Sequence, residues 1–150
     1  MRNPERPRYG KHFEEPRPIN IPDWELLEEV EALLGPHSEI GLQGPYGAYG
    51  GRENPVITYG VATVADLRAK VEERGVPLRA IRILKWIDDP KLVNGLYVKM
   101  HLTTGFREVF VSADEEDEAS VDDMTHRLAE MVSRAADRYT APPHSEPPQG

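Results

Sequence analysis

The segment GLYVKMHLTTGFREVFVS, residues 95–112, constrains the fold more than any other part of this chain. Apolar side chains occupy every second position from residue 96 to residue 102, and polar or aromatic side chains lie between them. This period of two is typical of a strand with one face in a core and the other face toward solvent. A second strand pattern follows a Thr-Gly pair, so the segment predicts an antiparallel hairpin.

The register of this hairpin depends on the length of its turn. A two-residue turn at 104–105 would place Met100 opposite Val109 on the buried face. It would also pair His101 with Glu108 on the other face. A three-residue loop would shift the register, so the expected pairing depends on the length of the turn.

Helical and strand patterns alternate along the rest of the chain. Apolar residues at three- and four-residue spacing predict three helices, and short apolar runs predict strands between them. The expected helices cover residues 22–35, 63–75 and 120–140, and the additional strands cover 38–43, 55–61 and 78–87. The order α-β-β-α-β-β-β-α predicts an α+β single domain, with a mostly antiparallel sheet of about four to five strands packed on three helices.

The last of these helices has the clearest amphipathic pattern. Its apolar residues recur at three- and four-residue spacing and should face the sheet. They are Val121, Met124, Leu128, Met131, Val132 and Ala135. The charged residues between them should lie mainly in solvent, with acids early and bases late along the helix dipole.

The net charge of −8 is concentrated in one short run. Residues 114–123 hold seven acids and no base, which leaves 19 of the 26 acids against 18 bases in the remainder. A nearly neutral body argues against broad attraction to nucleic acid, because neutralising phosphates requires a basic surface. The run could imitate a phosphate backbone, but acids in the first turn of a helix are the favoured interpretation.

Both ends of the chain are rich in proline and poor in apolar residues. Residues 1–20 and 140–150 carry four prolines each, and their composition predicts extended or disordered arms. The globular α+β domain would then cover residues 21–139. We expect the two arms to contact a protein partner, and weak nucleic-acid binding through the bases of the first arm is a further hypothesis.

The segment GLQGPYGAYGGRENP, residues 41–55, combines regularly spaced glycines with tyrosine and arginine. A strand is expected after it and no Gly-Lys-Ser/Thr follows, so the phosphate-binding loop of a nucleotide enzyme is not indicated. Tyrosine and arginine beside glycine favour a contact surface, while a plain strand connection is the simpler alternative. The candidate binding residues are Tyr46, Tyr49, Arg52 and Tyr59, with the carboxylate of Asp88 at a strand end.

Catalytic and metal-binding patterns are sparse. The chain has no cysteine and no HExxH or GxSxG motif. His126 shares a helix face with Asp122 and Glu130, a spacing for which ion pairing is favoured over a metal site. No catalytic residue, metal or cofactor is predicted, and an enzyme is the weaker class.

These observations favour a non-catalytic protein-interaction or assembly module, a component of a larger complex such as a phage or other particle. Its partner would contact the two arms and the loop 41–55. One alternative is a small-molecule-binding domain or enzyme with a pocket under that loop. A second alternative is an accessory or inhibitory protein whose acidic run occupies a nucleic-acid-binding partner. No apolar run approaches the roughly 20 residues of a membrane span, and no signal peptide is evident, so a cytoplasmic or virion-associated location is expected.

Overall fold

The computed structural model describes residues 7–35, 39–43, 58–61, 63–74 and 80–141. The strands are β1 (Arg8–Glu14), β2 (Glu39–Gln43), β3 (Thr58–Val61), β4 (Ala80–Ile87), β5 (Leu96–Thr103) and β6 (Arg107–Asp114). The helices are α1 (Trp24–Leu34), α2 (Val64–Arg74) and α3 (Glu118–Asp137), with a 3-10 turn η1 (Glu115–Asp117) before α3.

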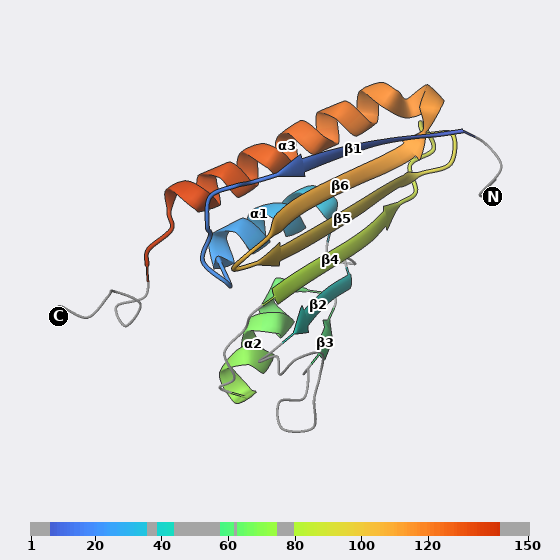
Figure 1. The fold of residues 1–150 in the computed structure, drawn as a ribbon. Helices are drawn as coiled ribbons and strands as arrows, with labels where there is room; N and C mark the ends of the chain where they lie inside the picture. The colour runs from blue at the N-terminus through green and yellow to red at the C-terminus, as the bar shows by residue number, and fades with distance from the viewer. Residues whose placement is uncertain (1–6, 36–38, 44–57, 62, 75–79, 142–150) are drawn as a thin grey trace, which may run out of the picture.

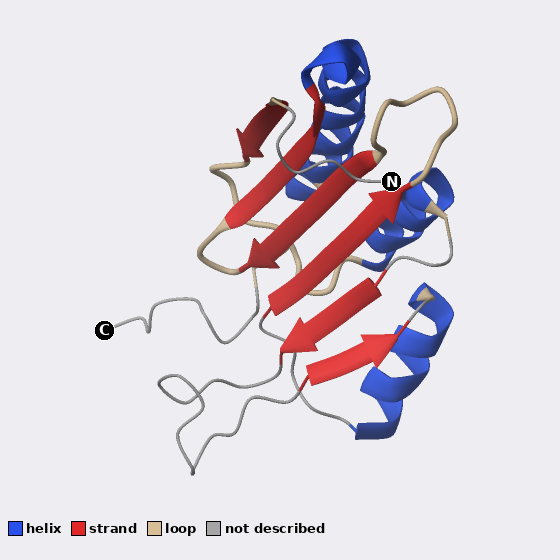
Figure 2. Cartoon of the chain, turned by 90° about the vertical axis from the view of Figure 1, so that its right-hand side faces the viewer, coloured by secondary structure: helices blue, strands red, loops and turns tan. Residues whose placement is uncertain are grey.

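The six strands form one antiparallel sheet in the order β1-β6-β5-β4-β2-β3, and the three helices lie on one face of it (Figures 1 and 2). α3 packs against β1 and β6, α1 lies between α3 and α2, and α2 lies beside β3. This arrangement confirms the predicted α+β domain, a mostly antiparallel sheet packed on three helices. The sheet has one strand more than the upper end of the expected range, because β1 was not foreseen.

The β5–β6 hairpin has the register expected from a two-residue turn. Met100 pairs with Val109, and His101 pairs with Glu108. The turn is closed by a hydrogen bond of 2.7 Å from the Thr103 amide to the Phe106 carbonyl. Since a slip of one residue would move every side chain to the other face, this turn places the apolar residues of β5 in the core.

The core lies between the sheet and the helices. The stripe on α3 faces the sheet as predicted, with Leu128 fully buried, while Met124 and Met131 lie partly buried at its border. The first turn of α1 is held by Asp23, whose carboxylate accepts a hydrogen bond of 3.0 Å from the Leu26 amide. Such an N-cap satisfies an amide that the helix itself leaves unpaired, which explains why α1 begins where it does.

The N-terminal segment differs from its sequence interpretation as an arm outside the globular domain. Residues 8–14 form β1, which pairs with β6 along its whole length and becomes an edge of the sheet. Tyr9 and Phe13 pack against the core, and Ile19 is 2% exposed. Low apolar content misled the interpretation, because three well-placed apolar side chains and a full backbone ladder with β6 are enough to hold the segment.

The chain that follows β1 is fastened to the end of α3. Glu15 is buried and accepts hydrogen bonds from Arg17 Nε at 3.1 Å and from Ser133 Oγ at 3.0 Å. The Arg17 guanidinium lowers the pKa of the Glu15 carboxyl, although burial acts in the opposite direction. Arg17 also forms an ion pair of 2.7 Å with Asp137, which lies 120 positions later in the chain. The C-terminal tail predicted at 140–150 lies outside the described residues beyond residue 141.

The acidic run has a structural role in this fold. Asp114 caps the turn η1 by accepting from the Glu116 amide, and Asp117 accepts from the Val93 amide at 2.8 Å. Asp122 Oδ1 accepts a hydrogen bond of 2.8 Å from Tyr9 Oη, which lowers the pKa of the carboxyl and raises the pKa of the phenol. The run therefore joins β1 and the β4–β5 loop to the start of α3.

Candidate functional site

The face of the sheet opposite the helices has no covering element among the described residues, and we call it the open face. It is carried by β1, β6, β5 and β4, whose alternate side chains point away from the core. The register assigns to it Arg8, His12, Glu14, Glu108, Phe110, Ser112, Tyr97, Lys99, His101, Arg82, Leu84 and Trp86. Figure 2 shows this face of the sheet in front of the helices.

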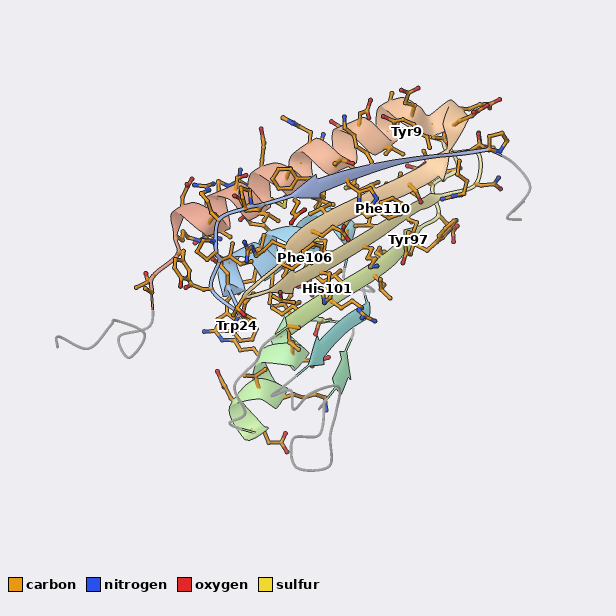
Figure 3. All side chains as sticks on the ribbon, in the orientation of Figure 1. Tyr9, Trp24, Tyr97, His101, Phe106 and Phe110 are labelled. Atoms are coloured by element: carbon orange, nitrogen blue, oxygen red, sulfur yellow. The ribbon has the colours of Figure 1, made fainter. Side chains whose placement is uncertain are left out.

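A row of rings crosses the open face from β1 to β4. The ring centroids of His12 and Phe110 lie 4.5 Å apart, those of Phe110 and Tyr97 lie 6.4 Å apart, and those of Tyr97 and Trp86 lie 6.2 Å apart. Tyr97, Phe110 and the nearby His101 can be followed along β5 and β6 in Figure 3. The spacing is that of tilted and edge-to-face aromatic pairs, so the rings support one another as a connected surface.

Two glycines leave the space that this row needs. A Cβ atom at Gly10 would lie 2.9 Å from Cε1 of Phe110, and one at Gly95 would lie 2.5 Å from Nε1 of Trp86. Gly95 also has a φ of +79°, which residues with a side chain rarely adopt. The indole is fixed further by a hydrogen bond of 2.9 Å from Nε1 to Asp88 Oδ1. Phe110 and Trp86 therefore lie close against the backbone at Gly10 and Gly95.

The charges around the row are mixed in sign. The Arg8 guanidinium lies 5.6 Å from the centroid of the Trp86 ring and donates to Ser112 Oγ at 3.0 Å. His12 Nδ1 lies 3.3 Å from Glu108 Oε2 at the other end of the row. Aromatic and arginine side chains over a mixed-charge surface are the composition of a protein interface, whereas a nucleic-acid surface would be mainly basic.

His101 lies near two positively charged side chains of the open face, Arg82 and Lys99. Burial lowers the pKa of its imidazole, and the positive charges of Arg82 and Lys99 lower it further. Glu108 acts weakly in the opposite direction. The imidazole is therefore favoured in its neutral form, which adds a polar ring to the surface without adding charge.

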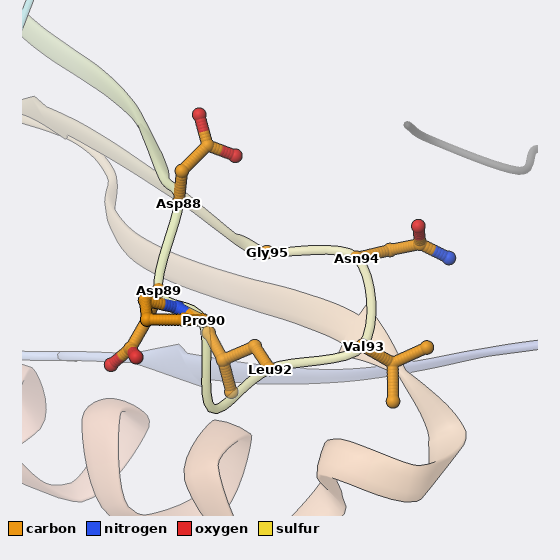
Figure 4. Close-up of a pocket in the computed structure, with 7 residues that line it drawn as sticks. All are labelled: Asp88, Asp89, Pro90, Leu92, Val93, Asn94 and Gly95. Atoms are coloured by element: carbon orange, nitrogen blue, oxygen red, sulfur yellow. The ribbon is translucent and has the colours of Figure 1, made fainter.

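Asp88 is the one sequence-predicted site residue with a described side chain. It follows β4 and lines a cavity of about 560 Å³ formed by the β4–β5 loop (Figure 4). The other lining residues are Asp89, Pro90, Leu92, Val93, Asn94 and Gly95. The two carboxylates point in different directions in Figure 4, and the lining contains no basic or nucleophilic side chain. The cavity thus lacks the acid–base pair that a hydrolytic site needs.

The structure does not bring Tyr59, another of the predicted residues, to this cavity. Tyr46, Tyr49 and Arg52 lie outside the described residues. Tyr59 belongs to β3, where the register aligns it through Leu42 with Ile81. These paired residues lie near the start of β4. Asp88 follows the end of β4, roughly 20 Å further along the strand at about 3.3 Å per residue.

The open face was not predicted as a site, although part of its signal was present. The alternation in residues 95–112 already placed Tyr97, Lys99 and His101 away from the core. Trp86 and His12 join them only through strand pairing, and the sequence does not show that β1 belongs to the sheet. A search for aromatic residues at the solvent-facing positions of predicted strands would have found half of the row.

The described residues contain neither a metal-binding cluster nor a membrane-spanning helix. No group of three or more His, Asp or Glu side chains is placed there to hold a metal ion. His126 Nε2 instead lies 3.0 Å from Glu130 Oε1, the ion pairing that their helical spacing favoured. None of the helices in the described ranges has the length and apolar character needed to cross a membrane.

Comparison with known proteins gives no match for this chain. No protein-family model, no curated protein and no solved structure is significantly similar to it.

Proposed function

We propose that this chain is a non-catalytic protein-interaction module, and that its partner binds on the open face of the sheet. The observation that carries the proposal is the row of four rings held in contact from β1 to β4. Large aromatic side chains on a rigid backbone lose little conformational entropy on binding, so they supply much of the binding energy at protein interfaces.

The chemistry of the rest of the described chain supports a binding role. The cavity at the β4–β5 loop presents two carboxylates but no basic or nucleophilic side chain beside them. The N-terminal segment is fastened to the domain by β1 and by the Glu15–Arg17 cluster. The segment that carries β1 is therefore not a flexible binding arm. We place the partner's binding surface on the open face of the sheet instead. Assembly into a larger particle remains within this proposal as one use of such a surface.

The proposal is tested by affinity purification from the cells that express the protein, with Tyr97→Ala and Phe110→Ala as separate variants. Each truncation of a central interface aromatic is expected to reduce recovery of a stoichiometric partner by at least about 10-fold, because such residues contribute about 2 kcal/mol or more. Arg127→Ala, on the exposed side of α3, is the matched control and should recover the partner as the wild type does.

Thermal unfolding must show that each variant remains folded at the temperature of the experiment. Equal recovery of the partner by the wild type and by both aromatic variants would contradict the proposal. Loss of the partner with Asp88→Asn alone, with both aromatic variants unaffected, would place the contact at the β4–β5 loop and would contradict binding on the row of rings.

A further inference from the structure

β1 is an edge strand whose outer side has no pairing strand among the described residues. Its inner side is identified by two hydrogen bonds beyond its ends, from the Glu15 amide to the Arg107 carbonyl and from the Glu115 amide to the Pro7 carbonyl. In an antiparallel pair the residues alternate between facing the partner and facing away. Odd-numbered residues of β1 therefore bond to β6, and the amides and carbonyls of its even-numbered residues face outward.

The outward-facing edge matches itself in one antiparallel register. If Lys11 lies on a two-fold axis, Arg8 of one copy faces Glu14 of the other, and Gly10 faces His12. All four residues are even-numbered, so their outward amides and carbonyls are in phase for mutual hydrogen bonding. A register shifted in either direction would separate Arg8 of one copy from Glu14 of the other.

The side of β1 that faces α3 is compatible with the same register. Tyr9 of one copy would face Phe13 of the other, an aromatic pair of the kind that stabilises adjacent strands. The two Lys11 side chains would meet at the axis, but each ammonium lies 3.3 Å from Asp122 Oδ1 of its own copy. Each positive charge thus keeps a carboxylate partner.

The stripe of α3 that lies along β1 carries a small residue as well as the exposed His126. Asp122 bonds to Tyr9 and Ser133 bonds to Glu15, so the stripe that contains both residues lies along β1. Ala129 falls on this stripe between them at helical spacing. Small side chains at such positions allow two helices to approach closely.

We infer that a second copy of this chain binds the free edge of β1, antiparallel and with Lys11 on the two-fold axis. The two sheets then form one continuous sheet, and the unpaired edge, which otherwise invites uncontrolled pairing, is closed. This inference concerns the backbone edge of β1, while the proposed partner binds on the open face, to which the side chains of Arg8 and Glu14 also belong.

Disulfide trapping tests the register directly, because the natural chain has no cysteine and only introduced thiols can react. Lys11→Cys should cross-link under mild oxidation, since the two side chains meet as a non-hydrogen-bonded pair with Cβ atoms about 4.5–5.5 Å apart. Arg127→Cys, on exposed α3, measures random collision and should cross-link at least about 10-fold more slowly. Faster cross-linking of His12→Cys than of Lys11→Cys would overturn the register.

Charge-reversal variants test the same interface without an introduced cysteine. Sedimentation equilibrium of the wild type should show a dimer, while Arg8→Glu and Glu14→Arg should each weaken it by about 3- to 30-fold, since each places two like-charge pairs in the interface. The double variant restores both pairs and should return to the wild-type value. A wild type that stays monomeric up to about 100 µM, or a double variant no better than the single ones, would overturn the inference.

Discussion

The two faces of this sheet are formed by the same strands but differ in solvent exposure and in the kind of side chain they carry. On the helix-covered face Val98, Met100 and Val109 are essentially inaccessible to solvent. On the open face their neighbours Tyr97 and Phe110 are partly exposed and are arranged as a row of rings. Because adjacent residues point to opposite faces, one strand can carry stability on one side and recognition on the other, and changes on the two sides should have separable effects.

The largest expected difference between the faces is in stability. Leu128→Ala removes a fully buried side chain of α3 and should lower the free energy of unfolding by about 2–5 kcal/mol. Asp123→Asn, on the solvent side of the same helix, breaks an ion pair with Arg127 and should cost at most about 1 kcal/mol. Urea denaturation of both variants gives the comparison. A larger loss from Asp123→Asn would mean that the acidic run is an internal site.

A smaller loss of stability is expected at Gly95, where the backbone conformation leaves space for a ring of the open face. Gly95→Ala combines a positive φ with a Cβ atom in the space of the Trp86 indole, so it should destabilise by about 1–3 kcal/mol. It should also shift the tryptophan fluorescence, because the indole must leave its place beside Asp88. Trp24→Phe removes the other tryptophan and isolates that signal. Unchanged emission from Gly95→Ala in this background would show that the glycine does not position the ring.

The smallest expected effect is a pH dependence on the open face. His101 has a lowered pKa in the folded protein, so its contribution is fully present above the ordinary imidazole pKa and is lost as the pH falls through the folded value. The wild type should therefore lose stability between about pH 7 and pH 5 more steeply than His101→Gln does. NMR titration should place the His101 midpoint below that of a histidine in an unfolded peptide. Parallel pH profiles for the two proteins would contradict this account.

The parts of the fold that local patterns could predict are those in which neighbours along the chain are also neighbours in space. The Thr-Gly turn predicted the hairpin register, and the apolar spacing of α3 predicted that Leu128 faces the sheet. β1 was missed because its partner strand lies far along the chain, as the 104-residue separation of the hydrogen-bonded pair Arg8 and Ser112 shows. The row of rings was missed for the same reason, since strand pairing alone brings Trp86 and His12 onto one surface.

The position of β1 also has a consequence for the synthesis of the chain. Its partner β6 and the helix that holds Glu15 and Tyr9 come much later in the chain, so β1 leaves the ribosome long before its pairing strand exists. β1 therefore stays unpaired until β6 has emerged, and its side-chain bonds to α3 form later still. A chain that ends before β6 therefore has its first strand without the pairing strand, with backbone groups left open to other molecules.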